Sequence, residues 1–138
     1  MRKSVLACAV VGLGLPVLLG ASPASAAVSP QSSGGGCSGN TAAGGGWSFS
    51  ACISARDTVV LPNGYLGSEG SRGSSCTIWV DLIKNGSVSS HRANPCNIDN
   101  GEMLFGVNTA GSGTYFTAIY AEVNGSYTSE VISPIEHN

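Results

Sequence analysis

The scarcest feature of this 138-residue sequence is charge, because Asp, Glu, Lys and Arg together make up 10% of it. Basic residues are fewer than acidic ones, with six Lys and Arg against eight Asp and Glu, and they form no cluster beyond the first three positions. Nucleic acids and anionic membrane surfaces attract proteins through clustered Lys and Arg side chains. The sequence therefore argues against both as partners of the protein.

Long apolar segments are also missing, with a single exception at residues 5–20. This run is uncharged, follows Arg2 and Lys3, and is followed by the small residues Ala24-Ser25-Ala26. It is shorter than the roughly 20 residues that a membrane-spanning helix needs, and its flanks are those of a secretory signal peptide. We expect a signal peptide at residues 1–26, a secreted, extracellular protein, and no membrane segment after cleavage.

The cysteines lack the C-x-x-C spacing of zinc and redox sites, and neither histidine lies near them at zinc-finger spacing. Of the five cysteines, Cys8 lies in the expected signal peptide, and the other four are Cys37, Cys52, Cys76 and Cys96. An even number of cysteines in an exported chain is typical of disulfides. Of the three pairings that four cysteines allow, we favour Cys37–Cys52 and Cys76–Cys96, because each closes a short loop.

The motifs of catalysis are missing as well. No G-x-S-x-G elbow occurs, and the two histidines are His91, in a polar stretch, and His137, next to the last residue. The acidic residues form no specific pair, and the oxygen-rich stretch from Asp99 to Glu102 fits a turn while leaving calcium binding open. We predict that the protein is not an enzyme and uses no metal or cofactor; a small hydrolase that depends on His91 is the less favoured hypothesis.

Glycine, in contrast, is abundant, with 20 residues. Residues 27–46 are rich in Gly, Ser and Ala and contain the triplets Gly34-Gly35-Gly36 and Gly44-Gly45-Gly46. Glycine triplets lose so much backbone entropy on ordering that we expect an extended, flexible N-terminal arm here. The arm is either a spacer or a segment that docks on a partner. The candidate contact residues of a docking arm are Ser33, Gly34, Gly35 and Gly36.

From Trp47 onward, apolar and polar residues alternate with the period of two that is typical of half-buried strands. The expected strands cover residues 47–54, 57–61, 76–84, 87–92, 103–107, 113–123 and 126–133, with Pro62-Asn63-Gly64 ending the second and Tyr65-Leu66 starting a further one. Asn85-Gly86 and Asn124-Gly125 are typical of tight hairpin turns. The sequence predicts an all-β domain at residues 47–138, an antiparallel β-sandwich of seven or eight short strands.

Large aromatic side chains are the remaining candidates for binding. On the expected strands these are Trp79, Phe116, Tyr120 and Tyr127. Some of them share a sheet face with the acidic residues Asp81 and Glu122. Exposed on a sheet, such a cluster binds sugars, peptides or a partner protein, whereas buried it would fill the core. We take Trp79, Tyr120 and Tyr127 as candidate partner-binding residues.

Several of these features resemble known families. Gly113-Thr114-Tyr115, at the start of a late strand, resembles the tyrosine corner of immunoglobulin-like folds and implies an immunoglobulin-like sandwich. The signal ending in Ala24-Ser25-Ala26, the Gly/Ser-rich start of the mature chain, the low charge and the two disulfides resemble small secreted β-sandwich proteins of actinobacteria. The layout is also similar to that of the linker subunit of umbrella-type toxin particles, in which a flexible N-terminal segment docks on one partner and a compact body holds another.

The last resemblance implies a secreted, non-catalytic adaptor in an extracellular assembly, with residues 27–46 as the arm and residues 46–133 as the body. Its partner is then another secreted protein. In size and cysteine number the chain also resembles subtilisin-inhibitor-like proteins and enediyne-binding apoproteins, although Pro95 precedes Cys96 where the inhibitors carry Cys-Pro. These two families imply the alternative functions of a protease inhibitor or a carrier of a small-molecule ligand.

Overall fold

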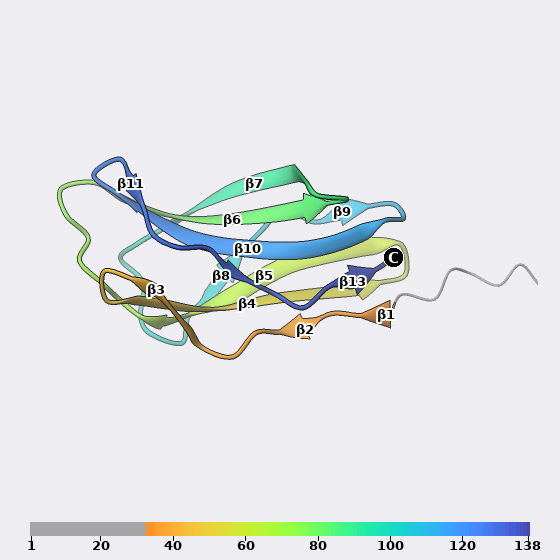
Figure 1. Ribbon diagram of the computed structural model, residues 1–138, viewed down its shortest axis with the longest axis horizontal. Coiled ribbons are helices and arrows are strands. Elements are labelled where there is room, and N and C mark those ends of the chain that lie inside the picture. Colours follow the sequence, from red (N-terminus) through yellow and green to blue (C-terminus); the bar gives the residue numbers. More distant parts are fainter. Residues whose placement is uncertain (1–32) are drawn as a thin grey trace, which may run out of the picture.

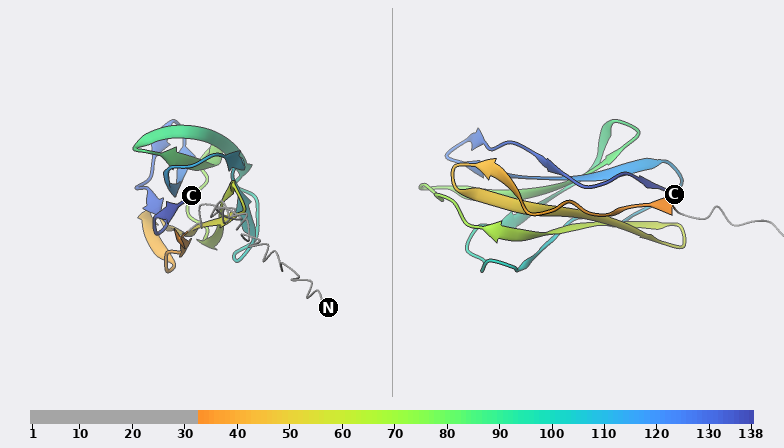
Figure 2. Two further views of the ribbon diagram at one scale, coloured as in Figure 1. Left: turned by 90° about the vertical axis from the view of Figure 1, so that its right-hand side faces the viewer. Right: turned by 60° about the horizontal axis from the view of Figure 1, so that its bottom comes forward.

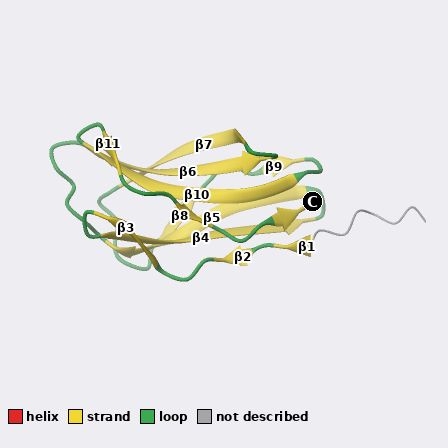
Figure 3. Cartoon of the chain, viewed as in Figure 1, coloured by secondary structure: helices red, strands yellow, loops and turns green. Residues whose placement is uncertain are grey.

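The structure, a computed structural model, describes residues 33–138 and consists of two antiparallel β-sheets that lie face to face (Figure 1). All regular elements of this part of the chain are strands, as Figure 3 shows, and it has no helix long and apolar enough to cross a membrane. The expected all-β sandwich is therefore confirmed. The expected signal peptide and residues 27–32 of the expected arm lie outside the described residues.

The first sheet, which we call sheet A, has seven strands in the order β1-β13-β10-β6-β7, with β11 and β12 also paired to β10. Its strands are β1 (Ser33–Gly34), β6 (Cys76–Lys84), β7 (Ser87–Pro95), β10 (Thr114–Val123), β11 (Ser126–Tyr127), β12 (Val131–Ile132) and β13 (Glu136–His137). The long strand β10 lies at the centre of this sheet, because it pairs with β6 on one side and with the C-terminal strands on the other.

The second sheet, sheet B, has six strands in the order β2-β4-β5-β8, with β3 paired to β4 and β9 paired to β5. Its strands are β2 (Gly36–Cys37), β3 (Thr41–Gly44), β4 (Trp47–Arg56), β5 (Val59–Ser68), β8 (Met103–Phe105) and β9 (Thr109–Ala110). The hairpin of β4 and β5 forms the body of this sheet, and the short strands border it on both sides.

The core lies between the two sheets, because the long strands turn alternate side chains inward. On β6, Ile78, Val80 and Leu82 are fully buried, whereas Trp79 lies on the outer face. The other large buried side chains are Trp47, Phe49, Ile53, Leu66, Leu104, Tyr115 and Ile119. Burying a large apolar side chain of this kind contributes roughly 1.5–3 kcal/mol to the free energy of unfolding. The expected alternation on the strands at 76–84 and 113–123 is confirmed.

The two expected hairpin turns are confirmed by the backbone. Asn85 and Gly86 have φ values of 50° and 83° between β6 and β7, and Asn124 and Gly125 have φ values of 52° and 77° between β10 and β11. Positive φ at both central residues of a two-residue turn matches the right-handed twist of the strands that it joins.

The sequence prediction was wrong at residues 62–64, which lie within the continuous strand β5 instead of ending a strand. The Pro62 carbonyl accepts a hydrogen bond from the Gly106 N–H (3.0 Å). The carbonyl and the nitrogen of Pro62 therefore face away from β4. Because of this orientation, the N–H that proline lacks removes no hydrogen bond between β5 and β4. Gly64 is needed because a Cβ atom there would collide with Ile119 of sheet A.

The expected strand at residues 126–133 is interrupted: it forms β11 and β12, and a further strand, β13, follows that the sequence did not indicate. Next to these short strands, polar side chains also accept hydrogen bonds from backbone N–H groups of β10. Thr128 Oγ1 accepts a hydrogen bond from the Ala121 N–H (3.0 Å). Ser133 Oγ accepts one from the Thr117 N–H (2.9 Å).

Both expected disulfides are present, Cys37–Cys52 and Cys76–Cys96. The first joins opposite residues of β2 and β4, and the second joins the start of β6 to the residue that follows β7. Disulfides persist in oxidising environments and are rare in the cytosol. The pairing therefore indicates an oxidising, extracellular kind of environment.

The first described residues pass from one sheet to the other (Figure 2). β1 pairs with β13 in sheet A, β2 pairs with β4 in sheet B, and the Gly35 N–H between them donates a hydrogen bond to the Ile135 carbonyl (2.7 Å). The second glycine triplet, residues 44–46, forms the turn between β3 and β4. Residues 33–46 of the expected arm thus pair with the sandwich.

The Tyr115 side chain has the geometry of a tyrosine corner. Its ring is fully buried at the start of β10, and its hydroxyl donates a hydrogen bond to the Gly111 carbonyl four residues upstream (2.8 Å). In immunoglobulin-like sandwiches a tyrosine hydroxyl bonds to upstream backbone in the same way. The bond ties the loop before β10 to the sandwich.

Candidate binding site

The outer face of sheet A gathers aromatic and acidic side chains from neighbouring strands. β6 lies between β7 and β10, and the register places Trp79 opposite Tyr120 and Asp81 opposite His91. On the next pair of strands, Glu122 lies opposite Tyr127. We call this group the aromatic–acid cluster; its members are Trp79, Asp81, His91, Tyr120, Glu122 and Tyr127.

Asp81 is the buried centre of the cluster, with 6% of its surface exposed. Its Oδ2 atom accepts a hydrogen bond from the Tyr120 hydroxyl (3.1 Å), and its Oδ1 atom pairs with His91 Nδ1. A buried carboxylate is costly unless polar partners replace the water that it has lost. The two partners therefore hold the Asp81 charge in place and are themselves oriented by it.

The Trp79 ring is held from two directions. It stacks on the His91 ring, with ring centroids 3.9 Å apart and an angle of 17° between the planes. Its Nε1–H donates a hydrogen bond to Glu122 Oε2 (2.8 Å). An aromatic side chain that is already oriented loses little conformational entropy when a partner binds to it.

Tyr127 is the most exposed member of the cluster, with 65% of its surface accessible. Its ring meets the Tyr120 ring edge to face, with centroids 5.7 Å apart and an angle of 74° between the planes. Two hollows border it near the β10–β11 hairpin. One, of about 460 Å³, reaches Trp47 and the β3–β4 turn, and the other, of about 250 Å³, is lined by Tyr120, Thr128 and Glu130.

Burial, together with the neighbouring Asp81 carboxylate, raises the pKa of Tyr120 well above its usual value. The more distant charge of Glu130 acts in the same direction. Tyr120 therefore remains a neutral hydrogen-bond donor to Asp81 at every physiological pH. The cluster presents a fixed set of aromatic rings whose nearby formal charges are mainly negative.

The pairing of Asp81 with His91 is also the arrangement that orients a histidine base in hydrolases. Such an enzyme needs a hydroxyl or thiol nucleophile bonded to the histidine. Within residues 33–138, the one hydrogen bond of the His91 side chain is the bond to Asp81. The arrangement thus supplies an oriented histidine without a bonded nucleophile.

The stretch at residues 97–102 forms a turn that uses its own carboxylate. Glu102 Oε2 accepts a hydrogen bond from the Asp99 N–H (3.0 Å), and the Asp99 carbonyl accepts one from the Glu102 N–H (3.0 Å). In the described part of the chain, no group of three or more His, Cys, Asp or Glu side chains is placed to hold a metal ion.

The structure separates the candidate residues from the sequence into two places. Trp79, Tyr120 and Tyr127 come together in the cluster, and Phe116 lies half-buried on the same face. The segment from Ser33 to Gly36 lies instead along β13 and β4. The sequence placed Asp81 and Glu122 on strand faces with aromatic residues, but it did not place His91 against Trp79.

Comparisons with known proteins return no relative: no family model, no curated protein sequence and no solved structure matches the chain.

Proposed function

We propose that this protein is a secreted, non-catalytic binding module that contacts another secreted protein through the aromatic–acid cluster. The observation that carries the proposal is the gathering of Trp79, Tyr120 and Tyr127 on one sheet face around the buried Asp81. The two disulfides and the expected signal peptide support secretion. The resemblance to the linker subunit of umbrella-type toxin particles supports the role of an adaptor in an extracellular assembly.

Three properties of the cluster favour a protein partner. Tyr and Trp are enriched at protein interfaces, where a few oriented aromatic side chains supply most of the binding free energy. The hollows beside Tyr127 can receive side chains of a partner. Glu122 of the cluster and Glu130, which lines the smaller hollow, favour a partner that presents Lys or Arg, and these residues also interact with exposed tyrosine rings.

Site-specific photo-crosslinking tests the proposal. A photoreactive phenylalanine replaces Tyr127 in the chain exported by the producing cells, and the culture fluid is illuminated. We expect one covalent adduct with a second secreted protein. The matched control carries the same residue at Val88, which is 60% exposed near the β6–β7 turn, far from Tyr127 along the sandwich. Adducts of equal yield at both positions, or none at Tyr127, would refute the role of the cluster.

The captured partner allows a second measurement. We expect Trp79→Ala and Tyr127→Ala each to weaken its binding at least about ten-fold, as is usual for aromatic residues at the centre of an interface. Val88→Ala should change the affinity less than about two-fold, because an exposed side chain outside the interface contributes little. Calorimetric titration of the three variants makes the comparison.

A small-ligand carrier is the second candidate, because the hollow of about 460 Å³ has the size of known ligand pockets, roughly 300–1,000 Å³. Trp47 and Val123 line part of it. Native mass spectrometry of the exported protein distinguishes the two functions. A carrier would show an additional small mass that is lost on unfolding, whereas an adaptor would show the mass of the protein chain alone.

A further inference from the structure

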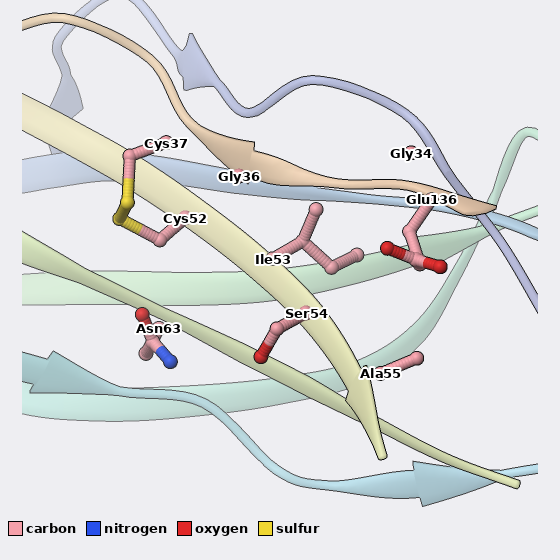
Figure 4. Close-up of a pocket in the computed structure, with 9 residues that line it drawn as sticks. All are labelled: Gly34, Gly36, Cys37, Cys52, Ile53, Ser54, Ala55, Asn63 and Glu136. Atoms are coloured by element: carbon pink, nitrogen blue, oxygen red, sulfur yellow. A yellow bond between two sulfur atoms is a disulfide. The ribbon is translucent and has the colours of Figure 1, made fainter. Parts of the chain in front are cut away.

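A further pocket, separate from the aromatic–acid cluster, lies where the N-terminal segment passes between the sheets. It has a volume of about 320 Å³, and the Cys37–Cys52 disulfide forms one of its walls. Figure 4 shows the Glu136 side chain reaching from β13 toward the β4 residue Ile53. We call this hollow the Glu136 pocket.

Glu136 is almost completely enclosed, with 3% of its surface exposed. Its Oε1 atom is buried and has no hydrogen-bond partner among the described residues. Within residues 33–138, the ion pairs join Arg72 to Glu69 and His91 to Asp81, so no cationic side chain of this part neutralises Glu136. A charged carboxylate in such a place is strongly unfavourable unless a cation compensates it, so Glu136 is the group of this pocket at which a cationic ligand would bind.

The backbone is shaped to admit this carboxylate. Gly35, with a φ of 76°, packs against Glu136 Oε2, and a Cβ atom at this position would collide with that oxygen and with the Ile53 carbonyl oxygen. Glycine at position 35 therefore leaves the space that the carboxylate occupies.

The other walls indicate which cation fits. Calcium needs six to eight oxygen ligands, whereas the pocket has one carboxylate, and the described residues hold no group of three metal-binding side chains. A primary ammonium is a compact cation that can form an ion pair with a single carboxylate, and Glu136 supplies that carboxylate. The partly buried Ala55 side chain offers an apolar contact for the methylene chain of an alkylammonium ion.

We propose that the Glu136 pocket binds a primary alkylammonium group, such as the side chain of a lysine. The carboxylate forms the ion pair, and the apolar wall of the hollow contacts the alkyl chain. This site does not depend on the function proposed for the aromatic–acid cluster.

Amide NMR spectra of the exported chain, titrated with n-butylammonium chloride, test the proposal. We expect saturable shifts at Gly36, Ile53 and Ser54, and none of these with tetramethylammonium chloride, which has no N–H donor. Glu136→Gln keeps the shape and removes the charge, and should weaken n-butylammonium binding at least about ten-fold. Equal shifts with both salts, or equal affinity in Glu136→Gln, would overturn the proposal.

A second pair of variants keeps the test independent of how Glu136→Gln folds. Ser54 is exposed at the pocket, so Ser54→Lys can bring its own ammonium to Glu136, whereas Ser54→Met has a similar length and no charge. We expect Ser54→Lys to raise the Tm above that of Ser54→Met and to abolish n-butylammonium binding. A Tm of Ser54→Lys at or below that of Ser54→Met would contradict the site.

The ammonium could come from another molecule or from the amino terminus of the exported chain itself. Beyond residue 26, Lys84 is the only lysine, so Lys84→Arg leaves the α-amine as the sole primary amine of the expected mature chain. If an external lysine is the ligand, this variant binds n-butylammonium directly. If the chain's own terminus is the ligand, it competes with n-butylammonium, so acetylation of the α-amine strengthens n-butylammonium binding. No binding before or after acetylation would overturn the proposal.

Discussion

At the scale of single residues, Asp81 affects the pKa of its neighbour Tyr120. Its charge and its hydrogen bond contribute, after burial, to the raised pKa of Tyr120. In Asp81→Asn the charge disappears while the size is kept, so we expect the Tyr120 pKa to fall toward the usual tyrosine value of about 10. An absorbance titration of tyrosinate measures the change, and Tyr120→Phe identifies which ionisation step belongs to this residue. If Asp81→Asn left the tyrosinate titration curve unchanged, Asp81 would not be a cause of the raised Tyr120 pKa.

The raised pKa of Tyr120 also predicts how the free energy of unfolding depends on pH. Below about pH 10 the tyrosine is protonated in the folded and unfolded chain, so the contribution of the raised pKa to stability is fully present. Above that pH the unfolded chain ionises first, and this contribution is lost as pH rises toward the folded-state pKa. Between pH 9 and pH 11, wild type should therefore lose more unfolding free energy than Tyr120→Phe. Urea unfolding at both pH values makes the comparison, and equal losses would speak against it.

Only part of the aromatic–acid cluster could be predicted from the sequence. The position of His91 could not, because it depends on a shift of one residue in the pairing of β6 with β7. Alternation places Trp79 and Asp81 on the same face of their strand, as observed. The turn pairs Lys84 with Ser87, and continued without interruption this register would place His91 opposite the buried Val80. A bulge between Leu82 and Ile83 shifts the register, so His91 lies opposite Asp81 instead. Such a shift moves a side chain to the other face of the sheet, and composition does not reveal it.

At the scale of elements, the two glycine triplets form defined changes of direction in the backbone rather than flexible spacers. Gly34, Gly35 and Gly36 all have positive φ, a conformation that other residues adopt at a cost. We expect Gly35→Ala to lower the free energy of unfolding by about 2–3 kcal/mol, because it combines a strained backbone with a collision against Glu136. Urea unfolding provides the measurement. The control is Gly39→Ala, where a Cβ atom meets nothing within 4 Å and the change should stay within about 0.5 kcal/mol.

The long strands could be predicted because their alternation is strong, whereas the short elements could not. β1, β2 and β13 are two residues long, and the pattern of two residues carries no periodicity. Their positions depend on contacts between segments that are distant in sequence, such as Gly34 with Glu136. The same is true of Pro62, whose place in a strand depends on which side of its backbone faces the neighbouring strand.

At the scale of the whole molecule, each of the two disulfides joins neighbouring strands within one sheet. Cys37–Cys52 links the strand that enters sheet B to β4, and Cys76–Cys96 closes the far end of the β6–β7 hairpin in sheet A. In the chain-entropy model, closing loops of 15 and 20 residues contributes about 3 kcal/mol each. Domains of this size have a total stability of roughly 5–15 kcal/mol. The disulfides therefore account for a large share of the stability of the sandwich.

We expect the Cys37→Ala/Cys52→Ala and Cys76→Ala/Cys96→Ala variants each to lose about 2–4 kcal/mol of unfolding free energy. The losses should add in the variant without all four cysteines, because the two bonds lie in different sheets and share no partner. Urea unfolding measures the three variants, and wild type in reducing agent should match the variant that lacks both bonds. The same agent should leave that variant unchanged, which controls for its effect as a solute. If wild type kept its unfolding midpoint after titration had shown four free thiols, the fold would be equally stable without the disulfides, and the contribution assigned to them would be wrong.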